Sequence, residues 1–209
     1  MTVFVLATHN AHKVDELRRI LGERLGHHEL IGYDGPEPVE DADTFEGNAL
    51  IKARAAAVFT GLPAIADDSG ICVDALGGAP GIHSARYAGT RDDGDNYRLL
   101  LKNLDGVADR AAQFVCAAAL VDVGALDAGP IPTGLQSSDG GFEHTERGTW
   151  PGSVLEAPAG SGGFGYDPIF RPDGLEVSSA ELTADEKNAV SHRAMAFGLL
   201  VAALRARYG

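Results

Sequence analysis

Continuous apolar runs and helix-spaced apolar stripes alternate along the first half of the chain. Residues 3–7 form a continuous apolar run, which is typical of a strand buried on both faces, and apolar residues at 14, 17, 21 and 25 then follow helical spacing. A second helix is predicted from the capping residue Thr44 to about Phe59, before an apolar strand that begins at Ala64. The pattern therefore predicts a strand, two helices and a second strand, as in an α/β fold.

The second half of the chain is predicted to be richer in strands. A third helix opens at position 92 or 93, and residues 112–123 form a long apolar stretch that is typical of a central strand. Residues 124–141 are rich in Gly, Pro, Asp and Ser, which predicts an extended surface loop or a hairpin tip. A strand pattern returns over residues 142–150, and a Thr-x-x-Glu capping box at Thr183 leads toward a closing helix.

This order of elements predicts a mixed sheet flanked by helices, with two lobes and a cleft between them. We expect residues 1–209 to form one two-lobed domain, because no linker-like segment separates independent parts. The first residues lack the basic leader and cleavage site of a signal peptide, so a cytoplasmic location is expected. Cys72 and Cys116 stand in apolar settings without metal-ligand spacing and are predicted to be core thiols.

The charge of the chain narrows the class of partner. The formal net charge is −13 at pH 7, whereas DNA and RNA polymers are held chiefly by basic surface. The longest apolar run is also far too short to span a bilayer. Nucleic acid polymers and membranes are therefore excluded as partners, but a nucleotide can still bind through a local group of Lys and Arg or through a divalent cation.

A carboxylate pair follows the apolar run of residues 64–66. Asp67 and Asp68 precede Ser69 and Gly70, which together predict a buried strand that ends in two carboxylates and a flexible turn, before a strand pattern continues over residues 71–73. Strand ends in α/β proteins open onto the crevice where ligands bind, and adjacent carboxylates suit a cation or a shared proton. The alternative is a turn in which Asp and Ser make only local hydrogen bonds.

A second candidate site lies between the first strand and the first helix. Thr8 and Asn10 can donate hydrogen bonds there, and Lys13 adds a positive charge near the helix N-terminus. Free backbone N–H groups and the helix dipole favour phosphate at such a position. The alternative is ordinary helix capping beside a surface lysine.

A glycine-rich run at residues 160–165 satisfies G-x-G-x-x-G, the pattern of dinucleotide-binding folds. The context disfavours that interpretation, because a strand-like Ile169-Phe170 follows instead of a helix. Phe164 within the run suits stacking on a flat ring, since neighbouring glycines allow close approach. Further along, the side chains of Lys187, His192 and Arg193 could read the edge of a base, although a solvated helix face is the plainer interpretation.

Together these motifs resemble those of the inosine triphosphate pyrophosphatase family, whose members hydrolyse deaminated purine nucleoside triphosphates. The resemblance spans nearly the whole chain, and the combination is far more specific than any one motif. It rests on Thr8-x-Asn10-x-x-Lys13, Thr44-Phe45, Asn48-Ala49, Lys52-Ala53, Ala66-Asp67-Asp68-Ser69-Gly70, Leu76-Gly77-Gly78-Ala79-Pro80-Gly81, Ser84-Ala85-Arg86-Tyr87, Gly163-Phe164-Gly165-Tyr166-Asp167-Pro168 and Ser191-His192-Arg193.

The resemblance implies an elongated mixed sheet, a homodimer and a Mg²⁺-dependent cleavage between the α- and β-phosphates that releases a nucleoside monophosphate and pyrophosphate. It assigns Asp68 as proton acceptor and metal ligand, and Glu40 as a second metal ligand. It also implies phosphate contacts in the loop around Thr8 and at Lys52. The purine would be surrounded by the loop around Phe164 and by the residues near 187–193. The implied substrate-binding residues are Thr8, His9, Asn10, Lys13, Lys52, Ser69, Phe164, Gly165, Tyr166, Asp167, Lys187, His192 and Arg193.

The chain departs from the family pattern at two places. Gly47 stands where an acidic residue usually precedes the Asn-Ala pair, and Glu46 is one residue too early to replace it. The segment 124–141 is longer and more polar than expected. Two other functions are also weighed. One is a related triphosphatase that prefers modified pyrimidines or ordinary nucleotides, because its phosphate-binding residues would look alike. The other is a non-catalytic nucleotide-binding or dinucleotide-binding module, which the glycine-rich run at residues 160–165 suggests.

Overall fold

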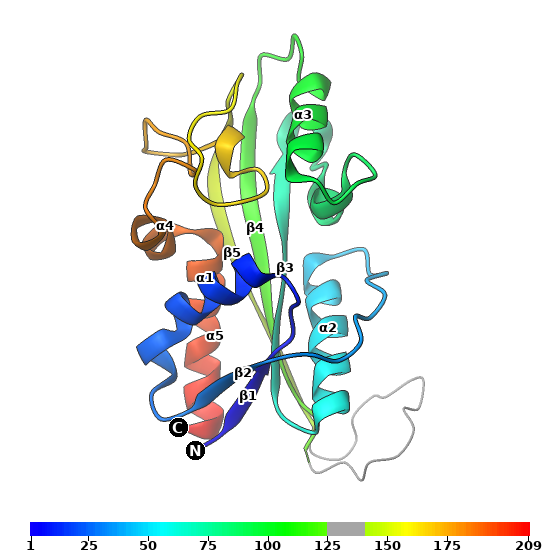
Figure 1. Ribbon diagram of the computed structural model, residues 1–209, viewed down its shortest axis with the longest axis vertical. Helices are drawn as coiled ribbons and strands as arrows, with labels where there is room; N and C mark the ends of the chain where they lie inside the picture. The colour runs from blue at the N-terminus through cyan, green and yellow to red at the C-terminus, as the bar shows by residue number, and fades with distance from the viewer. Residues whose placement is uncertain (125–140) are drawn as a thin grey trace. The chain divides into compact units, whose positions relative to one another are not determined.

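The computed structural model describes residues 1–124 and 141–209, and their strands form one mixed sheet (Figure 1). The strand order is β2-β1-β3-β4-β5-β6. β1 pairs in parallel with β2 and with β3, whereas β5 and β6 are antiparallel. The predicted mixed sheet is thus confirmed. The strands are β1 (Val3–Leu6), β2 (Glu29–Gly32), β3 (Ala64–Val73), β4 (Ala111–Asp122), β5 (Phe142–Val154) and β6 (Phe170–Pro172).

Three helices begin at the capping residues that the sequence predicted, and one of them also ends at a predicted glycine. The Thr44 side chain accepts a hydrogen bond from the Gly47 N–H, and Gly61 ends the same helix in the left-handed conformation. The predicted capping box at Thr183 is present, and Asp92 caps the third helix. The helices are α1 (Ala11–Leu21), α2 (Phe45–Thr60), α3 (Asp93–Asn103), α4 (Ala184–Val190) and α5 (His192–Tyr208), with 3-10 turns at Gly22–Leu25, Asp74–Leu76, Gly81–Arg86 and Asp167–Ile169.

The prediction that a strand ends in a turn after Asp68 is wrong. β3 continues through Ser69 and Gly70 to Val73 without a break. A Cβ at Gly70 would collide with the carbonyl oxygen of Gly81 and the hydroxyl of Ser84. Gly70 is therefore needed for close packing inside a strand rather than for a flexible turn.

Other differences from the predicted elements are small. β2 was not predicted, and β5 extends four residues beyond the predicted strand. Cys116 is buried as expected, whereas Cys72 is partly exposed. The predicted surface loop over residues 124–141 lies almost wholly outside the described residues.

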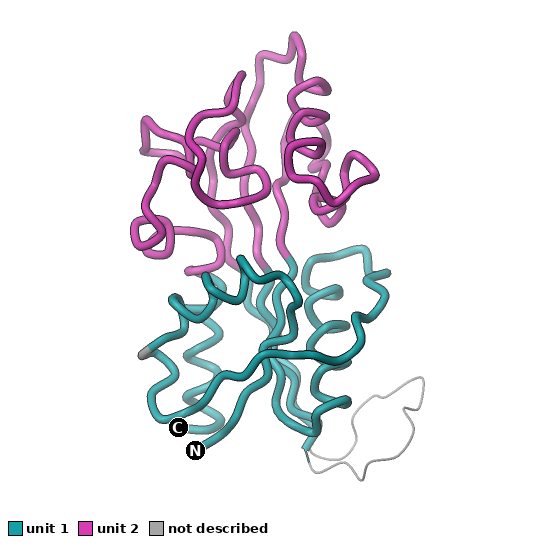
Figure 2. Tube along the Cα trace, in the orientation of Figure 1, with its two compact units in different colours: residues 1–68, 117–147, 196–209 teal, residues 69–116, 148–195 magenta. Residues whose placement is uncertain are grey.

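The chain divides into two compact units (Figure 2). Unit 1 contains residues 1–68, 117–147 and 196–209, and unit 2 contains residues 69–116 and 148–195. In unit 1, α2 lies on one side of the strands, and α1 and α5 lie on the other (Figure 1). In unit 2, α3 lies on one side of the strands, and a core that includes Leu100, Phe114 and Phe170 is fully or almost fully buried.

Among the described helices, none alone has the length and hydropathy needed to cross a bilayer. Only α4 and α5 taken together would meet that measure of length and composition, across a bend of 58°.

Candidate active site

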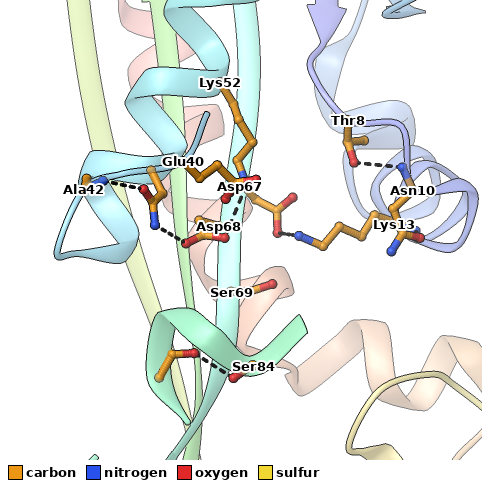
Figure 3. Close-up of polar contacts among 12 residues, drawn as sticks. Thr8, Asn10, Lys13, Glu40, Ala42, Lys52, Asp67, Asp68, Ser69 and Ser84 are labelled. Atoms are coloured by element: carbon orange, nitrogen blue, oxygen red, sulfur yellow. Dashed lines mark hydrogen bonds and ion pairs between the residues drawn. The ribbon is translucent and has the colours of Figure 1, made fainter. Parts of the chain in front are cut away.

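Two aspartates and two lysines meet at the last residues that β3 contributes to unit 1. Lys13 Nζ, from α1, donates to Asp67 Oδ2 at 2.9 Å, and Lys52 Nζ, from α2, donates to Asp68 Oδ1 at 3.2 Å. Lys52 Nζ also donates to Glu40 Oε2 at 3.1 Å. Figure 3 shows the two lysines reaching the carboxylates from different elements. The structure therefore brings together the catalytic, metal-binding and phosphate-binding residues that the resemblance assigned to this region.

Burial and charge act against each other in this cluster. Burial raises the pKa of Asp68, and Glu40 and Asp67 add to the rise, whereas Lys52 and Lys13 oppose it. Burial alone would lower the pKa of Lys52, but the three carboxylates outweigh it and raise that pKa. A carboxylate with an increased proton affinity, held beside a protonated amine, is suited to accept a proton from a bound molecule.

Helix α2 supplies a further polar contact that was not assigned a role from the sequence. Asn48 and Lys52 stand four residues apart and thus on one face of α2, and both contact Asp68. Asn48 Nδ2 donates to Asp68 Oδ2 at 3.3 Å, and the Asn48 side chain is almost fully buried. A polar amide in an otherwise alanine-rich buried stretch was the available signal in the sequence.

The loop between β1 and α1 is organised by capping. Asn10 is the N-cap of α1, and its Oδ1 accepts from the Lys13 N–H at 3.2 Å. Thr8 Oγ1 accepts from the Asn10 N–H at 3.2 Å, and the exposed His9 packs against Tyr33 with 5.4 Å between ring centroids. Local capping is therefore confirmed, and phosphate binding by Thr8, His9 and Asn10 stays a prediction.

The candidate base-binding residues gather in unit 2 around the Phe164 ring. Lys187 Nζ lies 5.2 Å and Arg193 Cζ 5.0 Å from the ring centroid, both within reach of a cation–π contact. Arg193 Nη2 also donates to Ser69 Oγ at 2.8 Å. Lys187, His192 and Arg193 are all buried, so the interpretation of this segment as a solvated helix face is wrong.

Buried contacts hold Lys187 and His192 in place. Lys187 Nζ donates to Asp167 Oδ2, which also accepts from the Phe164 N–H at 2.8 Å. The His192 ring stacks on Phe114 with 4.8 Å between centroids and 12° between planes. The ammonium predicted to read the base therefore holds the aromatic loop, and the His192 ring lies flat against Phe114.

The glycine-rich loop is anchored rather than free. Tyr166 is buried and donates to the Ser84 carbonyl oxygen at 2.8 Å, and burial raises the pKa of its hydroxyl. The Gly165 N–H donates to Asp93 Oδ2 at 2.6 Å, and a Cβ at Gly163 would overlap the Asp167 carboxylate. The run leads into a three-residue 3-10 turn, so it lacks the helix that a dinucleotide-binding loop requires.

The residues that could hold a divalent cation are Glu40 and Asp68. Their oxygen atoms already lie on either side of one positive charge, the ammonium of Lys52. Within the described residues no three acidic, His or Cys side chains form a closed cage. Mg²⁺ usually takes one or two carboxylates and completes its shell with water and substrate phosphates, so this donor set fits that ion.

Comparison with known proteins places the chain among proteins of one family. A model of the Ham1 family matches residues 4–203 of the chain. A dITP/XTP pyrophosphatase from Leifsonia xyli subsp. xyli is 52% identical over 209 residues, which cover 99% of this chain and 97% of the relative. A dITP/XTP pyrophosphatase from Streptomyces coelicolor is 49% identical, with 100% of both chains covered.

Two solved structures of similar proteins share the fold of this chain. A HAM1 protein from Coxiella burnetii superposes with a TM-score of 0.82 at 37% identity, over 98% of this chain and 99% of that one. A nucleoside-triphosphatase, also described as a dITP/XTP pyrophosphatase, from Mycobacterium abscessus has a TM-score of 0.71 at 42% identity, over 95% and 98% of the two chains.

Proposed function

This chain belongs to the Ham1 family, and from that premise we propose that it hydrolyses deaminated purine nucleoside triphosphates such as dITP, ITP and XTP. The products are the nucleoside monophosphate and pyrophosphate. The observation that carries the proposal is the cluster of Asp68, Glu40 and Lys52, with one ammonium 3.1–3.2 Å from two carboxylates. Relatives of about the same length that are named for this activity support the choice of substrate.

The phosphates are bound by residues of unit 1. Lys13 and Lys52 supply positive charge, and the Thr8 and Asn10 side chains with the first turn of α1 supply donors. Both lysines pair with carboxylates, and a phosphate oxygen can replace a carboxylate as their partner. The two lysines thereby stabilise the charge on the departing pyrophosphate.

Asp68 orients a water molecule and accepts its proton as the water oxygen bonds to phosphorus. The bond from that phosphorus to the pyrophosphate oxygen breaks, and the bond electrons leave with pyrophosphate. Glu40 and Asp68 would hold a Mg²⁺ ion, which supplies positive charge that offsets the phosphate oxygens. The raised pKa of Asp68 supports its role as the base.

The purine is recognised by residues of unit 2. Phe164 offers a ring for stacking, and His192 and Arg193 are donors that would pair with the oxygen at the six-position of hypoxanthine or xanthine. Adenine carries an amino group at that position and would leave buried donors unpaired. Lys187 contributes indirectly, because its ammonium holds Asp167 and thereby the Phe164 backbone. A homodimer and a cytoplasmic location stay predictions.

The test measures pyrophosphate and orthophosphate release from ITP, dITP, XTP, GTP and ATP, with Mg²⁺ and with a chelator. We expect pyrophosphate from ITP, dITP and XTP, and loss of activity on chelation. Orthophosphate release would contradict the proposed cleavage position. Equal rates on ATP would contradict the proposed reading of the base by His192 and Arg193.

A further inference from the structure

We infer that Asn48 is a positioning residue that ties the segment carrying Glu40 to Asp68 and so sets the spacing of these two carboxylates. The inference rests on the proposed function, because it concerns the two residues proposed to hold the divalent cation. Asn48 itself is not a ligand in this scheme. Its carboxamide makes hydrogen bonds with Asp68 and with the backbone of Ala42, which lies two residues after Glu40.

Both ends of the Asn48 carboxamide are engaged. Its Oδ1 accepts from the Ala42 backbone N–H at 3.0 Å, and its Nδ2 donates to Asp68 Oδ2 at 3.3 Å. A backbone N–H can only donate, so the contact with Ala42 settles which end of the amide is the oxygen. The NH₂ group must then face Asp68. One buried side chain therefore links the segment before α2 to the carboxylate on β3.

Gly47 explains why this segment can lie so close to α2. A Cβ at Gly47 would stand 2.6 Å from the Ala42 Cβ and 3.1 Å from Thr44 Oγ1. The space that a side chain at position 47 would need is thus occupied by Ala42. The acidic residue that the family pattern suggested here is replaced by tight packing, and Asn48 fastens the packed segment.

Unit 2 contains a matched asparagine that lacks the link to a carboxylate. Asn96 stands in the first turns of α3, four residues after its N-cap, as Asn48 stands four residues after Thr44 in α2. Asn96 Oδ1 accepts from the Ala88 N–H at 2.8 Å, and its Nδ2 donates to the Ala85 carbonyl oxygen at 3.3 Å. Both asparagines are almost fully buried. The two differ in what the NH₂ group holds: backbone in one case and Asp68 in the other.

This pair separates a structural role from a positioning role. Removing either amide leaves a partly buried backbone N–H of a preceding loop without its protein acceptor, so both proteins should lose stability. Only the loss of Asn48 should also weaken binding of a divalent cation. Removal of a side chain that orients a metal ligand typically weakens metal affinity by about 10- to 100-fold.

The experiment compares Asn48→Ala and Asn96→Ala with the full-length wild-type protein, using Mn²⁺ as the probe. Bound Mn²⁺ is measured from the loss of the paramagnetic resonance signal of the free ion, and thermal unfolding is followed without metal. We expect both variants to unfold at lower temperature, and Asn48→Ala alone to bind Mn²⁺ about 10-fold or more weakly. Unchanged Mn²⁺ affinity in a folded Asn48→Ala protein would overturn the inference.

A second variant covers the case in which Asn48→Ala does not fold. Gly47→Ala keeps the Asn48 amide and favours the helix, but its methyl group must displace Ala42. We expect stability somewhat below that of the wild type, because Ala42 must shift, together with weaker Mn²⁺ binding; equal Mn²⁺ affinity would contradict the inference. If the wild type itself bound no Mn²⁺, or bound it equally well after Asp68→Asn, the metal part of the proposed function would fail and the inference with it.

Discussion

The two units use buried charge in opposite ways. In unit 1, Lys52 is shared between Glu40 and Asp68, whose side chains keep 23% and 11% of their exposure. In unit 2, the Lys187–Asp167 pair keeps only 8% and 2%, and aromatic rings close around the neighbouring His192. A partly exposed charged side chain can exchange its partner for water or a ligand. A fully buried ion pair stays together and holds the surrounding backbone in one conformation. The cluster in unit 1 is therefore suited to chemistry on phosphates, and the buried pair in unit 2 is suited to holding a site that recognises a base.

The largest expected effect is on the chemistry of unit 1. Asp68→Asn removes the proposed proton acceptor, so kcat on ITP should fall by about 10²- to 10⁴-fold. The preference for ITP over ATP should change little, because the residues proposed to read the base belong to unit 2. Pyrophosphate release on both substrates measures this, with circular dichroism to show that the variant is folded. A folded variant with wild-type turnover would contradict the assignment of Asp68 as the proton acceptor.

Next in size is the contrast between the two lysines. Lys187→Met leaves Asp167 buried without its ion pair and should cost about 3–5 kcal/mol of unfolding free energy, with or without Mg²⁺. Lys52→Met should cost less, and Mg²⁺ should restore part of the loss, because the freed carboxylates can bind the metal. Urea unfolding of both variants measures the difference. Equal losses that ignore Mg²⁺ would contradict the comparison.

A smaller effect is expected at the aromatic ring of unit 2. Phe164→Leu removes a stacking surface, which is worth about 1–3 kcal/mol per base, so kcat/KM for ITP should fall about 10-fold. Phe59→Leu is the matched control, because Phe59 is an exposed phenylalanine on α2 of unit 1. Steady-state kinetics gives kcat/KM for ITP in both variants. A similar fall in both variants would mean that Phe164 does not stack on the base.

The smallest expected effect gives a baseline for an exposed ion pair. Arg54 donates two hydrogen bonds of 2.6 Å to Glu143, which lower the pKa of Glu143 below its usual 4.5. The side chains are 48% and 39% exposed, so water and salt screen the pair and Arg54→Met should cost less than about 1 kcal/mol.

The pH dependence of that pair has a definite sign. A carboxylate with a lowered pKa stabilises the fold above its usual pKa, and this contribution disappears as the pH falls through the lowered value. Urea unfolding at neutral and at acidic pH should therefore show the Arg54→Met loss only at neutral pH. A loss that persisted in acid would point to packing by the arginine side chain rather than to charge.

Local signals in the sequence were sufficient for most elements. Thr44, Asp92 and Thr183 cap helices because their side chains bond to N–H groups three residues away, and such contacts do not depend on the rest of the fold. β2 escaped prediction because it contains only two apolar residues, Leu30 and Ile31, and is defined by its pairing with β1. The continuation of β3 depends on the close approach of Ser84 to Gly70, which lies fourteen positions away in the chain.

The residues of the candidate site could be predicted from the sequence, but most of the contacts among them could not. Resemblance named Lys187 and Asp68, but only folding shows that Lys187 is bound by Asp167 and that Asp68 shares Lys52 with Glu40. Asn48 looks like an ordinary helix residue until Ala42 and Asp68 are seen at the two ends of its amide. Contacts over long sequence separations are set by packing, which the pattern of residue types does not encode locally.

The division of the chain into units bears on how the protein withstands cleavage. Its backbone passes from one unit to the other after residues 68, 116, 147 and 195. A single proteolytic nick at any one of these passages leaves three peptide connections intact. Neither unit is one continuous piece of chain, so no single cut can release either as a separate fragment. Separation of the two units by proteolysis would therefore demand several cuts.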